Sequence, residues 1–142
     1  MKKLLLITPA MLLSTLIFSQ KIKEKEVPAG VKLGFEKLYP NLKDVDWEKE
    51  GSNFEAEFEQ DENETSVVFD SNGHLLETET EIGVSSLPAN IITYLKNNYP
   101  NQKIKEAAKM VTPAGTTTYE TEIKGKDLIF DSNGNFLKEE KN

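Results

Sequence analysis

Hydrophobic residues recur along the chain first at helical spacing and then at every second position, and this succession occurs twice. Each occurrence opens with a proline, Pro28 or Pro88, which suits the first position of a helix. Apolar residues then recur at helical spacing: Val31, Phe35 and Leu38 in the first stretch, and Ile91 or Ile92, Leu95 and Tyr99 in the second. The tripeptide Tyr-Pro-Asn ends both stretches. The pattern therefore predicts two short amphipathic helices.

Segments of period two follow each predicted helix. Val45 and Trp47 alternate with acidic residues, and so do Phe54, Ala56 and Phe58. Further strands are indicated over 65–69 and 74–82 in the first stretch, and over 127–130 and 135–138 in the second. Each stretch thus reads as one helix followed by four antiparallel strands. We predict an α+β fold in which helices cover one face of an antiparallel sheet and acidic side chains leave the other.

An internal repeat of about 60 residues supports this division. Matching segments lie 60, 65 and 61 residues apart: Val27-Pro28-Ala29 with Leu87-Pro88-Ala89, Phe54 to Phe58 with Tyr119 to Ile123, and Phe69-Asp70-Ser71-Asn72-Gly73 with Phe130-Asp131-Ser132-Asn133-Gly134. We predict one domain over 27–142, made of repeats 27–82 and 87–138. The preceding segment 21–26 alternates charge without apolar periodicity, so we expect a charged leader and order from about Val27.

The N-terminus has the pattern of a secretory signal peptide over 1–20. Two lysines precede an apolar run of 15 residues from Leu4 to Phe18, which is shorter than the roughly 20 residues of a membrane span. Cleavage after Ser19 or Gln20 is expected. The chain has no cysteine, which excludes a lipid-modified cysteine and disulfides. These features predict a periplasmic or secreted protein without a membrane anchor after cleavage.

The mature chain is strongly acidic. Loss of Lys2 and Lys3 leaves 17 − 2 = 15 lysines against 24 acidic residues, so the net charge is 15 − 24 = −9. This charge excludes nucleic acid as a partner and disfavours anionic lipid. The counterparts it favours are cations and basic protein surfaces.

Few residues have the arrangement of a catalytic or metal site. The two Asp-Ser-Asn-Gly segments resume strand patterning at once, which favours hairpin turns with glycine at positive φ over calcium loops, although a weak cation site at Asp70 or Asp131 stays open. His74, the one histidine, reads as a solvated turn residue. No serine stands in a Gly-x-Ser-x-Gly elbow. We predict no catalytic residue, no metal site and no cofactor.

The acidic sheet face is the feature of the sequence that points most clearly to a function. By strand parity, ten carboxylates leave the sheet opposite the helices: Asp46, Glu48, Glu50, Glu55, Glu57, Glu77, Glu79, Glu81, Glu120 and Glu122. The candidate partner-binding residues among them are Glu48, Glu55, Glu57, Glu120 and Glu122. A solvated face that keeps the protein soluble is the alternative. Because Glu55, Glu57 and Glu59 alternate with core residues, we expect them to point to water, where nothing raises their pKa.

Two further expectations concern residues near this face. Like charges opposite one another weaken a sheet, so interleaved lysines should pair with some of the carboxylates: Lys49, Lys105, Lys109 and Lys124. The lone tryptophan, Trp47, shares its parity with Val45. This favours a core position for Trp47 over a role as a binding anchor.

Several of these segments together resemble one known family. They are Val27-Pro28-Ala29, Phe35 to Pro40, Val45 to Gly51, Phe54 to Phe58 and the two Phe-Asp-x-Asn-Gly turns. The chain resembles the PepSY-like proteins of the Gram-negative envelope, which are grouped with the β-lactamase-inhibitor-like fold. The resemblance implies tandem helix-plus-four-strand units in one curved sheet, a periplasmic or surface location and no known enzymatic activity. It implies no β-lactamase inhibition, because inhibitors with this fold use aromatic concave faces and disulfides.

The sequence leaves two functions open. The first is a non-enzymatic periplasmic binding or regulatory module that presents the acidic face to a protein, a peptide or a cation. The alternative is an inhibitor of an envelope hydrolase, which an exposed apolar or aromatic patch on the outer sheet would favour. A cleft holding two carboxylates with perturbed pKa values would instead favour an enzyme.

Overall fold

The structure, a computed structural model, describes residues 19–141, so the predicted signal peptide lies outside the described residues except for Ser19 and Gln20. The elements follow in the order β1 (Ser19–Ile22), the 3-10 helix η1 (Glu24–Glu26), α1 (Ala29–Leu38), β2 (Asp46–Glu50), β3 (Asn53–Gln60), β4 (Asn63–Phe69), β5 (Leu75–Glu81), the 3-10 helix η2 (Val84–Ser86), α2 (Ala89–Asn98), β6 (Glu106–Val111), β7 (Thr117–Ile123), β8 (Lys126–Asp131) and β9 (Phe136–Glu140). Both helices begin one residue after the proline that predicted them. Within residues 19–141, neither the helices nor any other helical segment has the length and hydropathy needed to cross a bilayer.

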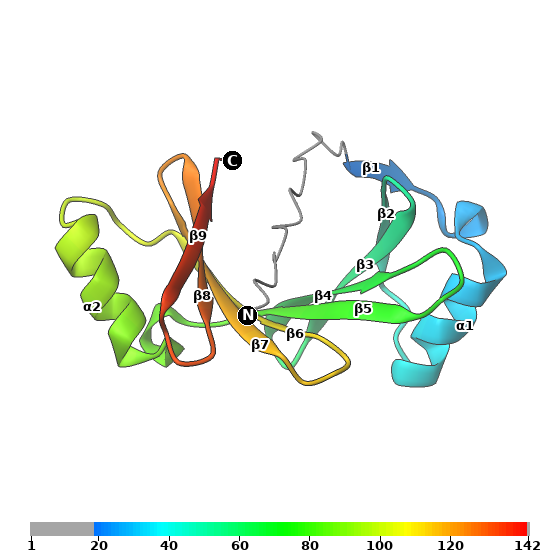
Figure 1. Cartoon of the computed structure of the whole chain (residues 1–142). Coiled ribbons are helices and arrows are strands. Elements are labelled where there is room, and N and C mark those ends of the chain that lie inside the picture. Colours follow the sequence, from blue (N-terminus) through cyan, green and yellow to red (C-terminus); the bar gives the residue numbers. More distant parts are fainter. Residues whose placement is uncertain (1–18, 142) are drawn as a thin grey trace, which may run out of the picture.

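All nine strands form one antiparallel sheet in chain order, from β1 at one edge to β9 at the other. The sheet bends between its two halves, so that α1 packs outside one half and α2 outside the other, while the inner faces look toward each other (Figure 1). This arrangement confirms the predicted α+β fold of two repeats on one curved sheet.

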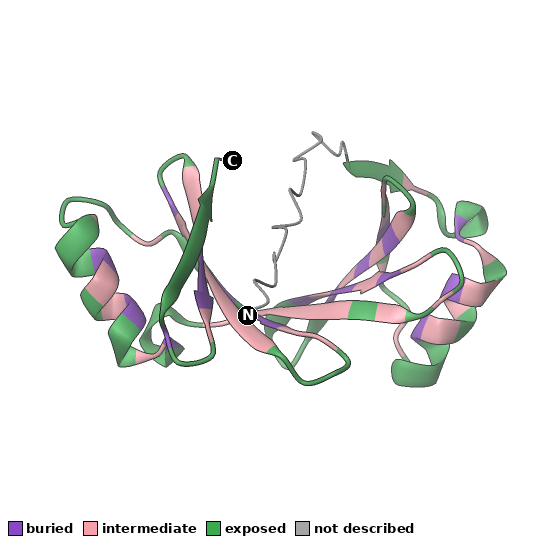
Figure 2. Ribbon diagram, viewed as in Figure 1, coloured by how far each residue is buried: buried purple, intermediate pink, exposed green. Residues whose placement is uncertain are grey.

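Each half has its own hydrophobic core between helix and sheet (Figure 2). Val31 and Phe35 of α1 are buried against the first half, and Ile91 and Leu95 of α2 against the second. Leu38, which the helical spacing placed in the core, is 48% exposed. It is the last residue of α1, and the next residue makes the contact instead: the Tyr39 ring lies 4.6 Å from the Phe58 ring, centroid to centroid.

Trp47 belongs to the first core, as its parity predicted. It is 6% exposed, and its ring packs edge-on against Phe35 at 5.3 Å between centroids. In the second repeat Ala107 stands 60 residues later, also buried. The two cores therefore share a backbone plan but fill it with side chains of different size.

The expected charged leader is not a leader in the structure. Lys21 and Ile22 belong to β1, which pairs with β2 so that Ile22 lies opposite Trp47. β1 is followed by η1 and α1, in the same way that β5 is followed by η2 and α2. Ile22, at the end of β1, corresponds to Ile82, which stands 60 residues later, after the end of β5. The segment was missed because an edge strand with one inward apolar residue shows no periodicity. β5 thus closes the first repeat and also takes the place in the second repeat that β1 takes in the first.

The two Asp-Ser-Asn-Gly turns are confirmed as hairpin turns with glycine at positive φ, +88° for Gly73 and +81° for Gly134. In the first repeat the turn rests directly on α1. A Cβ atom on Gly30 would lie 2.9 Å from the carbonyl oxygen of Asn72, and one on Gly34 would lie 2.4 Å from that of Gly73. Glycines that weaken α1 as a helix therefore allow its close contact with the β4–β5 turn.

Candidate functional site

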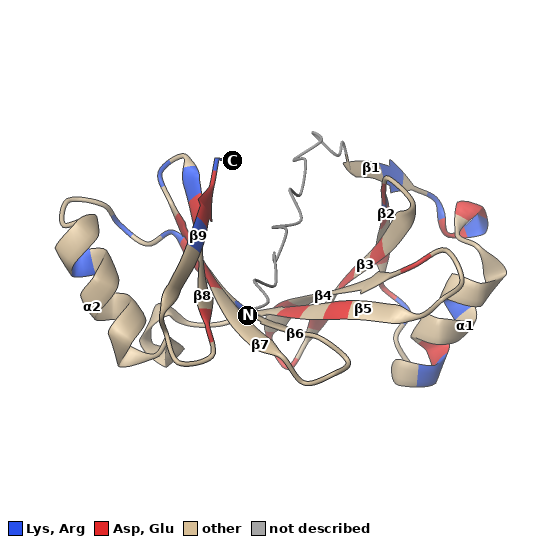
Figure 3. Cartoon of the chain, viewed as in Figure 1, with Lys and Arg blue, Asp and Glu red and all other residues tan. Residues whose placement is uncertain are grey.

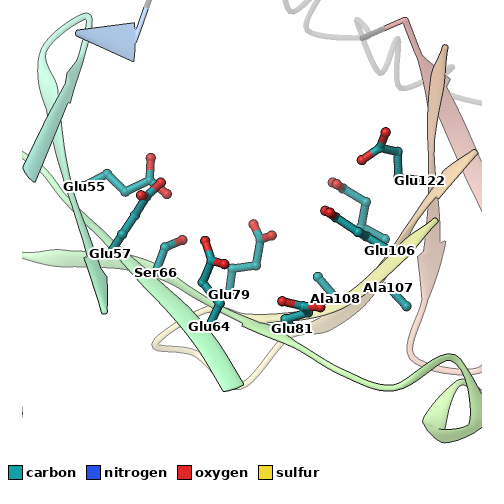
Figure 4. A pocket seen from close by; sticks show the side chains of 11 residues that line it. Glu55, Glu57, Glu64, Ser66, Glu79, Glu81, Glu106, Ala107, Ala108 and Glu122 are labelled. Carbon is teal, nitrogen blue, oxygen red and sulfur yellow. The ribbon is translucent and has the colours of Figure 1, made fainter. Parts of the chain in front are cut away.

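The concave face of the sheet holds a cup of about 150 Å³ lined mainly by carboxylates (Figure 4). Eight glutamates line it from both halves of the sheet: Glu55, Glu57, Glu64, Glu79, Glu81, Glu106, Glu120 and Glu122. We call this set the acidic cup. In Figure 3 the acidic positions follow the inner strands on both sides of the bend.

Strand register explains why these glutamates meet. Residues that face each other across antiparallel strands point to the same side of the sheet. Glu57 lies opposite Ser66, and Ser66 lies opposite Glu79. In the second half, Glu106 lies opposite Glu122. The alternating sequences of β3, β5 and β7 each put two glutamates on this face, β4 and β6 add one each, and the bend of the sheet turns the two halves toward one another.

The five residues predicted as a site fall into two groups. Carboxylate oxygens of Glu48, Glu55 and Glu57 lie within 4.8 Å of one another on the β2–β3 side. Glu120 and Glu122 project from β7 on the other side. Glu48 stands next to the lining residues, opposite Glu55 across the β2–β3 pair. The structure therefore brings four of the five into the acidic cup and puts the fifth beside it.

The expectation that nothing raises the pKa of these carboxylates is wrong. Burial, followed by repulsion from neighbouring carboxylates, raises the pKa of Glu79 to about 7 and that of Glu120 to about 7. Burial also raises the pKa of Glu55 and of Glu57, and nearby carboxylates add to the effect. The cause is the curvature of the sheet, because a concave face removes water from side chains that a flat face would leave solvated.

Lysines neutralise this face only in part. Lys105 pairs with Glu122, Nζ to Oε1 at 2.9 Å, as predicted for the interleaved lysines. Lys49 and Lys109 do not share that role: Lys49 Nζ lies 5.8 Å from the centroid of the Phe54 ring, and Lys109 lies opposite Tyr119. Phe54 and Tyr119 pack in the two cores, so both lysines belong to the helix-covered side of the sheet.

Sequence reasoning missed part of the acidic cup. Glu64 and Glu106 were not assigned to the acidic face, and Glu79 and Glu81 were assigned to it but not to the site. Parity along each strand was available from the sequence, whereas the register between strands was not. Once a hairpin register is known, Glu64 follows directly, because it lies opposite Glu59.

The two turn aspartates are occupied by the turns themselves. Oδ1 of Asp70 accepts hydrogen bonds from the backbone N–H groups of Asn72 and His74 at 2.8 and 3.0 Å, and Oδ2 lies 2.9 Å from His74 Nδ1. Asp131 accepts three hydrogen bonds, two from the backbone N–H groups of Asn133 and Asn135 and one from the side-chain amide of Asn135. Hydrogen bonds from residue 74 or 135 are the main cause of the lowered pKa of each aspartate. A cation at either position would have to displace these donors.

The comparisons with known proteins address the family and the fold. A search of curated proteins gave no match. A solved structure described as a BLIP-like protein from Bacteroides fragilis is 28% identical, with a TM-score of 0.65 over 80% of this chain and 86% of that one. A DUF2874 family protein from Bacteroides ovatus is 20% identical, with a TM-score of 0.71 over 80% and 86%. A protein from Bacteroides eggerthii described as a "putative periplasmic" one is 15% identical, with a TM-score of 0.74 over 81% and 88%.

A family model matches the chain twice, over residues 17–77 and 62–138. Its description is "Putative beta-lactamase-inhibitor-like, PepSY-like" and names no enzymatic activity. Both matches include a strand before the helix, β1 in the first and β5 in the second. With the nine-stranded sheet and its two helices, they place this chain in the PepSY-like family of the β-lactamase-inhibitor-like fold.

Proposed function

We propose that this protein is a non-enzymatic binding module of the bacterial envelope, and that its acidic cup receives a lysine- or arginine-rich segment of a protein or peptide. The observation that carries the proposal is the convergence of eight glutamates on one concavity. Solubility alone would be served by charges spread over convex surfaces, where water solvates them.

The electrostatics of the acidic cup favour a cationic ligand. Burial, and after it repulsion between neighbouring carboxylates, raises the pKa of both Glu79 and Glu120 to about 7. A cation placed among them would replace this repulsion with attraction. A flexible cationic side chain suits a shallow cup of this volume, because its charged end can enter while its stem stays at the rim.

The periplasm or the extracellular space is the proposed location. The N-terminal pattern of residues 1–20 supports export, and a structural neighbour carries a periplasmic description. The PepSY-like family is also consistent with an envelope protein.

Binding of a decalysine peptide to the mature chain tests the proposal, measured by calorimetry at low ionic strength. Replacing three cup residues, in Glu57→Gln/Glu79→Gln/Glu120→Gln, should weaken binding about tenfold or more. The matched control, Glu24→Gln/Glu26→Gln/Glu36→Gln, removes three carboxylates from η1 and α1. At pH 8, where Glu79 and Glu120 are mostly ionised as well, this control should bind like wild type. Equal weakening in both variants would mean that net charge, not the acidic cup, attracts the peptide.

The pH dependence of binding gives a second test. Protons compete with the peptide for Glu79 and Glu120, so binding should strengthen between pH 6 and pH 8. A parallel titration with Ca²⁺ separates a small cation from a peptide, since Glu48, Glu55 and Glu57 lie close enough to share an ion. Calcium binding without peptide binding would contradict the proposal.

The acidic cup also bears on an enzymatic function and on an inhibitory one. Two carboxylates with raised pKa values meet the condition set above for an enzyme, but both move in the same direction, whereas acid–base catalysis needs values moved apart. An inhibitor of an envelope hydrolase remains the alternative function. Among the described residues, glutamates, Ser66, Ala107 and Ala108 line the acidic cup, so the cup itself supplies no aromatic patch for such an inhibitor.

A further inference from the structure

A pair of stacked aromatic rings lies on the other side of the sheet, where α2 meets the start of β9. The rings of Tyr94 and Phe136 are nearly parallel, at 8° and 5.0 Å between centroids. Both stand edge-on to the buried ring of Phe130, at 5.4 Å for Tyr94 and 5.9 Å for Phe136. Phe136 is nonetheless 36% exposed. The stack is therefore a partly exposed aromatic surface with a fixed orientation.

Neutral amides surround this stack. They line, with the two rings, a shallow depression of about 370 Å³: Asn90, Asn97, Asn98 and Asn135. No charged residue among those that the structure describes lines the depression, although 29% of the chain is charged. A surface this neutral does not select an ionic ligand.

Hydrogen bonds hold three of the amides in place. The Nδ2 groups of Asn90, Asn98 and Asn135 donate to Asn133 O, Tyr94 O and Asp131 Oδ2, each at 2.9 Å. An amide carries two N–H donors and one carbonyl acceptor. Each therefore keeps a second N–H and an oxygen that can meet a ligand, without the entropy cost of ordering a free side chain.

The first repeat shows that the fold does not require this surface. The corresponding positions there hold Gly30, Gly34, Lys37, Leu38, His74 and Leu75. That repeat closes its core by close contact of α1 with the turn, without a ring stack. Structural need alone thus does not account for two aromatic rings and four amides on one face.

We propose that this depression is a binding site for a neutral saccharide. The flat C–H face of a pyranose ring packs on an aromatic face, and its hydroxyl groups both donate and accept hydrogen bonds, which is the pairing that side-chain amides offer. The depression lies on the helix side of the sheet, so a ligand there and a ligand in the acidic cup do not compete for the same residues.

The test is an NMR titration of the ¹⁵N-labelled mature chain with three neutral oligosaccharides, cellotetraose, maltotetraose and chitotetraose. At least one should give saturable shifts confined to α2, the β8–β9 turn and β9. Asn97→Ala should weaken that binding about fivefold, the loss of one hydrogen bond, without changing the melting temperature, because Asn97 is exposed. Phe136→Leu should weaken it further while keeping an apolar residue on the core.

The matched control is Lys37→Ala, at the position of the first repeat that corresponds to Asn97, and it should bind like wild type. The absence of saturable shifts with all three sugars up to about 10 mM would overturn the proposal. So would shifts that Asn97→Ala and Phe136→Leu leave unchanged. A neutral peptide, triglycine, is titrated alongside, and saturation by triglycine in place of the sugars would assign the depression to peptides.

Discussion

Replacing Gly73 with alanine tests how the β4–β5 turn and α1 fit together. A Cβ atom at this position would lie 2.0 Å from the carbonyl oxygen of Gly30 and 2.5 Å from its carbonyl carbon. Both are backbone atoms of a helix, so no side-chain rotation can relieve the overlap. The helix or the turn must shift, and the first core packs against both.

The magnitude follows from comparison with a second glycine. Gly125 also has positive φ, +74°, but a Cβ atom there would meet nothing within 4 Å. Alanine at Gly125 should therefore cost only the left-handed backbone conformation, about 1 to 2 kcal/mol. Gly73→Ala should lose the same conformational free energy and a further ~1 to 3 kcal/mol from overpacking, so that its free energy of unfolding falls by about 2 to 5 kcal/mol in total.

Urea denaturation followed by circular dichroism measures both variants against wild type. We expect the free energy of unfolding of Gly73→Ala to fall below that of Gly125→Ala by about 1 to 3 kcal/mol. Gly134→Ala should lie between them, because its Cβ would approach the Asn90 Cβ at 2.9 Å, a milder overlap than the one at Gly73. Equal destabilisation of Gly73→Ala and Gly125→Ala would refute the direct contact between turn and helix.

Three further predictions concern the core, the acidic cup and export. Thr121 is fully buried and, within residues 19–141, its hydroxyl has no hydrogen-bond partner. Thr121→Val should therefore raise the free energy of unfolding by about 1 kcal/mol, and a loss of stability would show that the hydroxyl is bonded. Glu79 and Glu120 have pKa values of about 7 in the folded state against 4.5 for the free group, so the folded state binds more protons between these pH values. The free energy of unfolding should therefore fall as pH rises from about 4.5 to 7, by about 1 to 3 kcal/mol after allowance for solvent screening. Denaturation at several pH values should show a flatter slope for Glu79→Gln/Glu120→Gln than for wild type. Mass spectrometry of the protein from its native envelope should find an N-terminus at Gln20 or Lys21, and recovery of the intact apolar segment would point to an anchor instead.

The elements with strong periodicity were predictable from the sequence. The stripe of Val31 and Phe35 indicated α1, and the alternation from Phe54 to Phe58 indicated β3. Gly73 and Gly134 were assigned positive φ because a short hairpin turn requires it. These features depend on local spacing, which a single sequence contains.

The depth of the acidic cup was not predictable. Parity sent Glu55 and Glu57 to the outer face, but it contained nothing about the curvature that removes water from them. Neither did it indicate that Glu79, from the first repeat, raises the pKa of Glu120, from the second. Both properties arise from contacts between distant segments.

The double role of β5 has a consequence for dissection of the protein. Its Thr78 to Glu81 pair with β4 or β6 on either side, so the boundary between the repeats runs through a strand and not through a linker. A fragment starting at Leu87 would leave the edge of β6 bare, and a fragment ending at Phe69 would do the same to β4. The repeat that is visible in the sequence is therefore not an autonomous folding unit, and we expect the two halves to unfold in one cooperative transition.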